Sequence, residues 1–241
     1  ARKYDLIFLT TGVEALEEIA PAVSGIAHPG SVILSATNGI PPWYSLKQDT
    51  TIGRFEFSTA PREAFSRFIN PESVLGVVVG RFAHSASPGV VSEAGGSGYT
   101  IGTLDHQPSA RVSEVQRFLA ESGITVRISD NIHRDIWLKL IGNVARTPLS
   151  VLTEKNIGEM LSEPATEGRM RTLCREVVAV GVRLGVISDR DFNEEAYFTF
   201  LRDRLSEHRT SMLRHFQTNK RLEIDRIIGA VRMLAVADGP A

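Results

Sequence analysis

A lysine and an asparagine four residues apart, Lys139 and Asn143, are the first residues whose types and spacing suggest chemistry. An ammonium group can donate a proton, and a carboxamide can hold a polar ligand. Both lie in a stretch of helical periodicity and form one stripe along the edge of its apolar arc. The arc consists of Ile136, Trp137, Leu140, Ile141 and Val144. The same pattern is also typical of a surface lysine whose alkyl chain lies over apolar neighbours.

A glutamate and a serine later in the chain are the next candidates. Glu223 precedes Ile227 by four residues, so it is predicted to face the buried side of a helix that begins near Leu222, whereas Asp225 faces solvent. A glutamate there could equally well only complement the helix dipole. Ser211 lies in a long helical pattern that ends near Arg214.

A third candidate, Asn38-Gly39, directly follows a predicted strand over residues 31–36. An Asn-Gly pair is most often only a turn. Ligands of open α/β sheets, however, bind at the carboxyl ends of the strands, which is where Asn38 is expected. Pro148 is expected to end or kink the helix that carries Lys139, with non-helical backbone at Thr147.

The elements that must position these residues change character near Asp130. The first part alternates apolar strands with amphipathic helices, which predicts an α/β layer. Its strands are expected at residues 4–11, 31–36, 73–80, 89–92, 99–102 and 125–129, and its helices after Gly12 and at 109–122. The strand at 4–11 is expected to be buried on both faces. The second part is predicted to be all helical, at residues 132–145, 167–184, 191–214 and 223–237.

Composition excludes several classes of protein. The chain has 241 residues, 42% hydrophobic and 23% charged, with a formal net charge of -1, so we expect a globular protein without nucleic-acid or membrane partners. The single cysteine, Cys174, and the lack of a leader-like segment favour the cytoplasm. No G-x-G-x-x-G fingerprint or metal-ligand spacing is present, and Gly96-Ser97-Gly98 is interpreted as a hairpin or bulge.

Taken in order, the motifs resemble those of the ketopantoate reductase family, that is, 2-dehydropantoate 2-reductase. They are a strand-end Asn-Gly, then W-x-K-L-x-x-N-x-x-x-x-P-L, then Ser-Met-Leu, then Glu-Ile-Asp. The resemblance covers most of the chain. It implies an α/β, partial Rossmann-type domain at residues 1–130, a remnant that lacks the glycine-rich first βαβ unit. It also implies an all-helical C-terminal domain at 131–241, of the 6-phosphogluconate dehydrogenase C-terminal type, for substrate binding and dimerisation.

The resemblance further implies NADP(H)-dependent reduction of 2-dehydropantoate or a related branched 2-keto acid in pantothenate biosynthesis. Lys139 would protonate the ketone oxygen and Glu223 would support it. Asn143, Ser211 and Thr147 would occupy substrate-binding positions, whereas Asn38, Gly39 and Glu223 would contact the cofactor. The residue types agree with these roles, because an ammonium stabilises the alkoxide that forms when hydride adds to a ketone.

The sequence differs from the family pattern at three positions. Gly12 stands where members usually carry a cofactor-contacting lysine, Thr147 where they carry a second asparagine, and Arg146 where they carry an apolar residue. With the cofactor half incomplete, we expect weak NADPH binding by this chain alone. The alternative is a non-catalytic relative that binds small acids or dimerises after losing its cofactor site. A homodimer is the one protein partner the resemblance suggests.

Overall fold

The structure is a computed structural model that describes residues 2–44 and 59–236. The described residues up to Ile136 form one compact unit, and those from Trp137 onward form a second. An α/β unit is thus followed by a helical one, which confirms the predicted fold class. The boundary lies inside one helix, after the predicted junction near Asp130.

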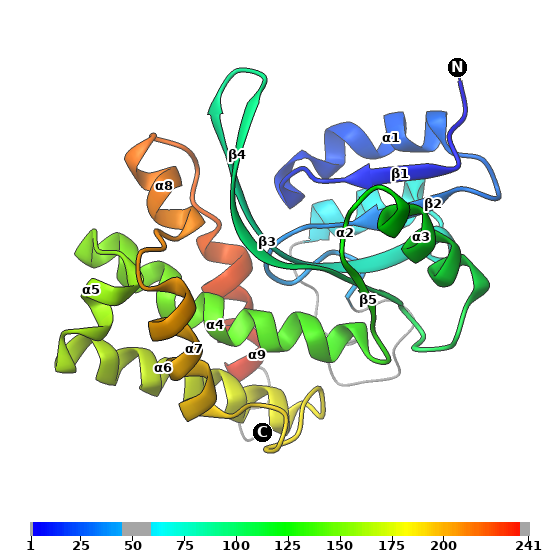
Figure 1. The fold of residues 1–241 in the computed structure, drawn as a ribbon. Coiled ribbons are helices and arrows are strands. Elements are labelled where there is room, and N and C mark those ends of the chain that lie inside the picture. The colour runs from blue at the N-terminus through cyan, green and yellow to red at the C-terminus, as the bar shows by residue number, and fades with distance from the viewer. Residues whose placement is uncertain (1, 45–58, 237–241) are drawn as a thin grey trace. The chain divides into compact units, whose positions relative to one another are not determined.

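The α/β unit is built on a five-stranded sheet with strand order β1-β2-β3-β4-β5. β3 and β4 form a long antiparallel hairpin, and the other neighbouring pairs are parallel (Figure 1). The strands are β1 Leu6–Leu9, β2 Val32–Ser35, β3 Val74–Ser87, β4 Val90–Thr103 and β5 Val126–Ile128. The two short segments predicted at 89–92 and 99–102 are therefore parts of one strand, β4.

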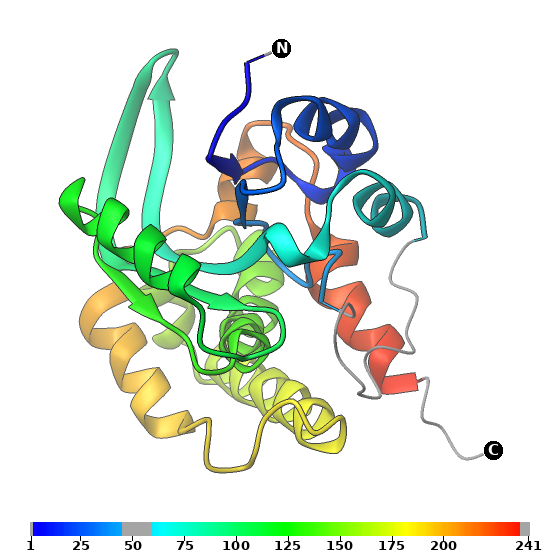
Figure 2. The ribbon, with the colours of Figure 1, turned by 90° about the vertical axis from the view of Figure 1, so that its right-hand side faces the viewer.

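Three helices cover the sheet, α3 on one face and α1 with α2 on the other (Figure 2). They are α1 Leu16–Ile26, α2 Thr59–Phe68 and α3 Ala110–Glu121, and short 3₁₀ turns occur at Val13–Ala15 and Pro71–Ser73. Val112, Val115 and Leu119 of α3 pack against buried side chains of β2, β3 and β4. One face of the strands therefore packs against the side of α3 on which residues three and four positions apart are buried.

One prediction about the sheet is wrong and another is confirmed. The prediction that the first strand is buried on both faces is wrong, because β1 is an edge strand and Phe8 on one of its faces remains 41% exposed. The bulge expected at Gly96-Ser97-Gly98 is confirmed. The register between β3 and β4 shifts around Arg81, which pairs with Gly96, and both glycines have positive φ.

The second unit contains only helices and turns among its described residues. After α4 Ile132–Thr153 come α5 Ile157–Leu161, α6 Pro164–Arg183, α7 Glu194–Leu205, α8 Ser211–Gln217, a wide helical turn at Asp225–Gly229 and α9 Ala230–Val236. Cys174 of α6 is buried in this core, and burial raises the pKa of its thiol to about 12.

In the described ranges, no helix is both long and apolar enough to cross a membrane.

Two predictions about helix ends are wrong. α4 continues through Pro148 with Thr147 in the helix, and the hydroxyls of Thr147 and Ser150 donate to the carbonyls of Asn143 and Thr147 on either side of it. The helix expected over 191–214 is instead interrupted between α7 and α8. Carbonyls of the interrupting segment accept hydrogen bonds from the first residues of α5, which holds it out of helical geometry.

The core of the helical unit contains a close contact that predicts opposite effects for two glycines of α6. The indole of Trp137 donates to the Val177 carbonyl at 3.2 Å and lies directly where a Cβ at Gly181 would be. Gly181→Ala should therefore lower the free energy of unfolding by about 1–3 kcal/mol. Gly168→Ala, with open space around its Cβ, should raise it by about 0.5–1 kcal/mol. Urea denaturation measures both, and equal shifts would contradict the contact.

Candidate functional site

One face of α4 carries three of the predicted site residues at successive turns: Lys139, Asn143 and Thr147. Lys139 is half-buried, and the other two are buried. The Thr147 hydroxyl donates to the Asn143 carbonyl at 2.7 Å, which ties two of the three together. The apolar arc predicted beside this stripe is buried, from Ile136 to Val144. Lys139 and Asn143 are thus side by side at the margin of the core.

The environment of Lys139 suits a proton donor that acts near neutral pH. Burial and, to a smaller extent, the positive charge of Arg146 lower its pKa to about 8, and the negative charge of Glu223 opposes part of the shift. The side chain is only half-buried, yet desolvation is the main cause, because protein atoms surround the ammonium closely. An ammonium with such a pKa is still mostly protonated at pH 7 and releases its proton more readily than an ordinary lysine.

Glu223 reaches Lys139 from the start of the last helical segment. Glu223 is half-buried, Ile227 is buried and Asp225 is exposed, as the spacing predicted. The backbone N–H of Ile227 bonds to the Glu223 carbonyl at 3.2 Å, so Glu223 lies one turn before the buried face. The structure therefore brings Glu223 within electrostatic reach of Lys139.

Ser211 is the exposed first residue of α8, not part of a longer helix. Its neighbour Thr210 is buried, and the Thr210 hydroxyl accepts the N–H of Leu213 at 3.2 Å, which caps α8. The Thr210 and Ser150 hydroxyls are 2.5 Å apart, so this cap also joins α8 to α4. Ser211 is thus held next to the residue that contacts α4.

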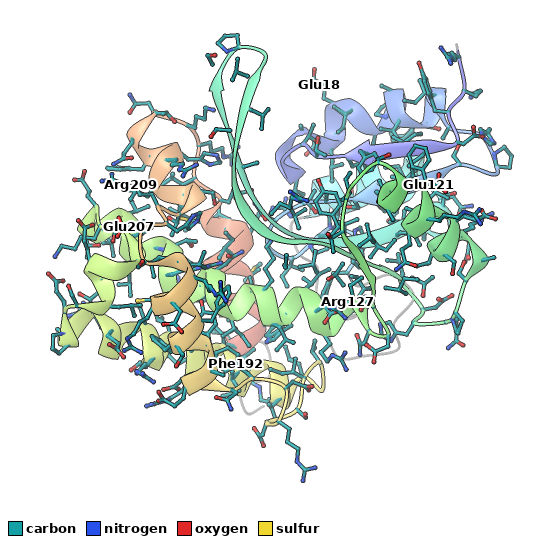
Figure 3. The ribbon with its side chains drawn as sticks, viewed as in Figure 1. Glu18, Glu121, Arg127, Phe192, Glu207 and Arg209 are labelled. Atoms are coloured by element: carbon teal, nitrogen blue, oxygen red, sulfur yellow. The ribbon has the colours of Figure 1, made fainter. Side chains whose placement is uncertain are left out.

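Three further residues gather around this face of α4 and were not predicted. A terminal nitrogen of Arg146 donates to Asn143 Oδ1 at 3.2 Å. The charge of Arg146 also acts on Tyr197 of α7 and on His208, which follows α7. Burial and the charges of Arg146 and Arg214 lower the pKa of His208 to about 4, so its ring is neutral at pH 7. Glu207 and Arg209, labelled in Figure 3, lie on either side of His208 in the segment that joins α7 to α8.

Asn38 and Gly39 belong to the α/β unit and follow β2 by a few residues, as predicted. Both are half-buried, and Gly39 has φ 72°, a conformation that favours glycine. The hydroxyl of the preceding Thr37 is buried and has no hydrogen-bond partner among the described residues. A buried hydroxyl without a partner is costly, and a ligand at the end of β2 would satisfy it.

The α/β unit also contains a contact between a buried histidine, His133, and a half-buried one, His106, that no sequence pattern indicated. His133 Nε2 donates to the Tyr44 carbonyl at 3.0 Å, while His133 Nδ1 and His106 Nε2 are 2.8 Å apart. The Tyr44 hydroxyl returns a hydrogen bond to the His133 carbonyl at 2.8 Å. Burial and the neighbouring His106 lower the pKa of His133 to about 3, against its bond to Tyr44. The ring is therefore neutral, with Nδ1 as an acceptor.

This pair predicts acid destabilisation of the α/β unit. Because the pKa of His133 is about 3 when folded and near 6.5 when unfolded, its stabilising effect is present above pH 6.5 and is lost as the pH falls. At pH 4.5 the loss should approach about 3 kcal/mol. Thermal melts between pH 7 and 4.5 measure it. His133→Gln should reduce this slope, and His28→Gln, at a partly exposed histidine that contacts Asp5, is the comparison variant. An unchanged slope in His133→Gln would show that the folded ring is solvated.

Among residues 2–44 and 59–236, no group of three or more His, Cys, Asp or Glu side chains could hold a metal ion.

Comparison with known proteins gives consistent matches. The family described as "Ketopantoate reductase PanE/ApbA C terminal" matches residues 131–239. The 2-dehydropantoate 2-reductase of Mesorhizobium japonicum is 28% identical over 228 residues, which cover 91% of this chain and 66% of the relative. That of Archaeoglobus fulgidus is 28% identical over 159 residues, 66% of this chain and 52% of the relative. The chain thus spans about two thirds or less of the length of these relatives.

Solved structures show the same fold. A Ralstonia solanacearum protein assigned as a ketopantoate reductase has a TM-score of 0.87 at 26% identity, covering 98% of this chain and 71% of that one. D-Mandelate dehydrogenase with NADH and anilino(oxo)acetate has a TM-score of 0.80 at 21% identity, covering 100% and 72%. The order of the motifs, the α/β and helical units and these matches agree: residues 131–239 match the C-terminal model of the ketopantoate reductase family, and most of the chain is similar to 2-dehydropantoate 2-reductases.

Proposed function

We propose that the protein reduces a small 2-keto acid with a nicotinamide cofactor, and that Lys139 is the proton donor. The observation that carries the proposal is the placement of Lys139 beside Asn143 and within reach of Glu223, with its pKa lowered to about 8. Folding alone does not require a lysine to be desolvated in this way, since a surface lysine would extend into water.

Each residue has a defined task in this proposal. As negative charge develops on the ketone oxygen, the Lys139 ammonium stabilises that charge and then donates a proton from Nζ to the oxygen. Glu223 favours the charged form of Lys139 and so keeps the proton in place until it is needed. Asn143, Thr147 and Ser211 are the proposed substrate-binding positions. Of these, Asn143 is the one that lies one helical turn from Lys139.

NADP(H) is the proposed cofactor, and it would supply the hydride. In this chain Thr37, Asn38 and Gly39 would hold part of it, because the unsatisfied Thr37 hydroxyl and the permissive backbone of Gly39 fit a ligand at the end of β2. Glu223 is a further proposed contact. The names of the reductase relatives and the NADH bound to D-mandelate dehydrogenase support a nicotinamide cofactor.

The substrate is proposed to be 2-dehydropantoate or a related branched 2-keto acid. Full-length protein incubated with NADPH or NADH and a panel of 2-keto acids should oxidise the cofactor, followed by its absorbance. Faster turnover with NADPH would establish the proposed preference. Binding of keto acids without any turnover would favour the non-catalytic alternative instead. Dimerisation through the helical unit stays a prediction, which size-exclusion chromatography with light scattering would test.

A further inference from the structure

We propose that Arg146, together with the amide of Asn143 and the hydroxyl of Tyr197, binds the carboxylate of the keto-acid substrate. The inference rests on the proposed function for the identity of the acid, but not for the existence of the anion site. It assigns a binding role to a position where the family pattern has an apolar residue.

Arg146 is a half-buried cation without a matching anion. Its Nη2 donates to Asn143 Oδ1 at 3.2 Å, and it forms no ion pair with any residue in the described ranges. By contrast, Arg171 in the same unit is paired with Glu167, Glu194 and Glu195. An arginine has five N–H donors in a planar fork that suits a carboxylate, so most of the donors of Arg146 remain available.

The bond to Arg146 also fixes the direction of the Asn143 side chain. Because Asn143 Oδ1 accepts from Arg146, the Nδ2 group must point the other way and can only donate. Asn143 is buried, and its neighbour along the stripe is Lys139. The face of α4 thus offers donors from Arg146, Asn143 and Lys139 in succession, which is the complement of an acidic ligand and not of a cation.

Tyr197 supplies the second and independent observation. Its hydroxyl is buried, and among the described residues it has no hydrogen-bond partner. The hydroxyl lies against α4: a Cβ at Gly142 would be only 2.6 Å from Tyr197 Oη, so the glycine makes room for it. Gly142 precedes Asn143 and lies one turn before Arg146. A buried O–H without an acceptor is rare in proteins, and a carboxylate oxygen bound there would accept from it.

The charges at the site suit a ligand with a single negative charge. The charges that act on Lys139 are the positive charge of Arg146 and the negative charge of Glu223, so that these three side chains together carry one positive charge; His208 is neutral, and Arg214 adds a further positive charge beside it. This excess of positive charge suits a carboxylate. The ligand class is therefore a small 2-oxo monocarboxylate, with its keto oxygen toward Lys139 and its carboxylate toward Arg146.

The test compares an acid with its uncharged ester. Binding of 2-oxoisovalerate and of its methyl ester to the full-length protein is measured by calorimetry, with and without NADP⁺. In Arg146→Leu, the Kd of the acid should rise about 10- to 100-fold, while the Kd of the ester stays unchanged. Arg146→Lys should recover part of the loss. Arg169→Leu, an exposed arginine of α6, is the matched control and should bind the acid as the wild type does.

Tyr197→Phe separates binding from folding. Since the hydroxyl has no partner in the described structure, its removal should leave the melting temperature unchanged or raise it, and yet weaken binding of the acid several-fold. Equal weakening of acid and ester in Arg146→Leu, or no binding of the acid by the wild type, would overturn the inference. Acid binding that needs Arg146 but never leads to turnover would refute only the proposed function; turnover unaffected by Arg146→Leu would refute only the anion site.

Discussion

Lys139→Ala is expected to lower kcat for a 2-keto acid by about 10²- to 10⁴-fold, the usual effect of removing a positioned general acid. The ammonium is the group that would stabilise the developing alkoxide and donate its proton, and water is a poorer donor in the same place. The measurement is the initial rate of cofactor oxidation at saturating keto acid, in the full-length protein.

The control for this variant is Asp225→Ala. Asp225 carries a charge in the same region but is exposed, so its removal should change kcat little. Because Lys139 is half-buried and desolvated, Lys139→Ala should not unfold the helical unit, and its melting curve should confirm this. Turnover near the wild-type level in a folded Lys139→Ala protein would show that Lys139 is an ordinary surface lysine.

The second large effect is expected on the pH dependence of the rate. A proton donor must be protonated, and burial lowers the pKa of Lys139 to about 8. Above that pH, kcat/KM should fall about tenfold per pH unit, so that at pH 10 it is about 100-fold below its plateau. An ordinary lysine would keep the rate constant up to about pH 10. The profile is measured between pH 6 and 10.5.

The pH above which kcat/KM falls, the alkaline limb of the profile, should move in opposite directions when the two charged neighbours of Lys139 are removed. Glu223 raises the pKa of Lys139, so Glu223→Gln should shift the limb to lower pH. Arg146 lowers the pKa, so Arg146→Leu should shift the limb to higher pH, in addition to its effect on acid binding. Asp225→Asn should not move it. A limb that stays in place in both variants would mean that another group controls the rate.

The parts of the site that the sequence predicted are those set by helical periodicity. Lys139, Asn143 and their buried apolar neighbours follow from a spacing of 3.6 residues per turn, which local sequence carries. The same reasoning gave the buried side of Glu223 and the exposed side of Asp225. β1, β2 and the first half of β3 were recognisable from their apolar runs for a similar reason, whereas the glycine-containing β4 was predicted only as two short pieces.

The errors arise where contacts distant in sequence outweigh local preference. Helical geometry persists through Pro148, where the flanking Thr147 and Leu149 are buried, so packing outweighs the loss of one backbone N–H. The break before Ser211 depends on hydrogen bonds to α5, which no local pattern reveals. Helix α2 was not predicted because its polar first turn, with Pro61, resembles a loop.

Tertiary proximity also explains which site residues were missed. Tyr197 is more than fifty positions from Gly142 in the chain, and only the packing of α7 brings its hydroxyl to α4. The substitution at Arg146 was visible in the sequence, but its hydrogen bond to Asn143 and its lack of an ion pair in the described ranges were not. His106 and His133 likewise meet only in the folded α/β unit.

The single cysteine gives the helical unit a built-in chemical reporter. Only a thiolate reacts rapidly with alkylating reagents, and burial raises the pKa of Cys174 to about 12 while also blocking access to its sulfur. Labelling can therefore proceed only when the core around α6 opens. The rate of modification then reports how often this core opens, not the reactivity of an exposed thiol. Because Cys174 is the only cysteine in the sequence, a mass increase of one label identifies the unit that opened without further mapping.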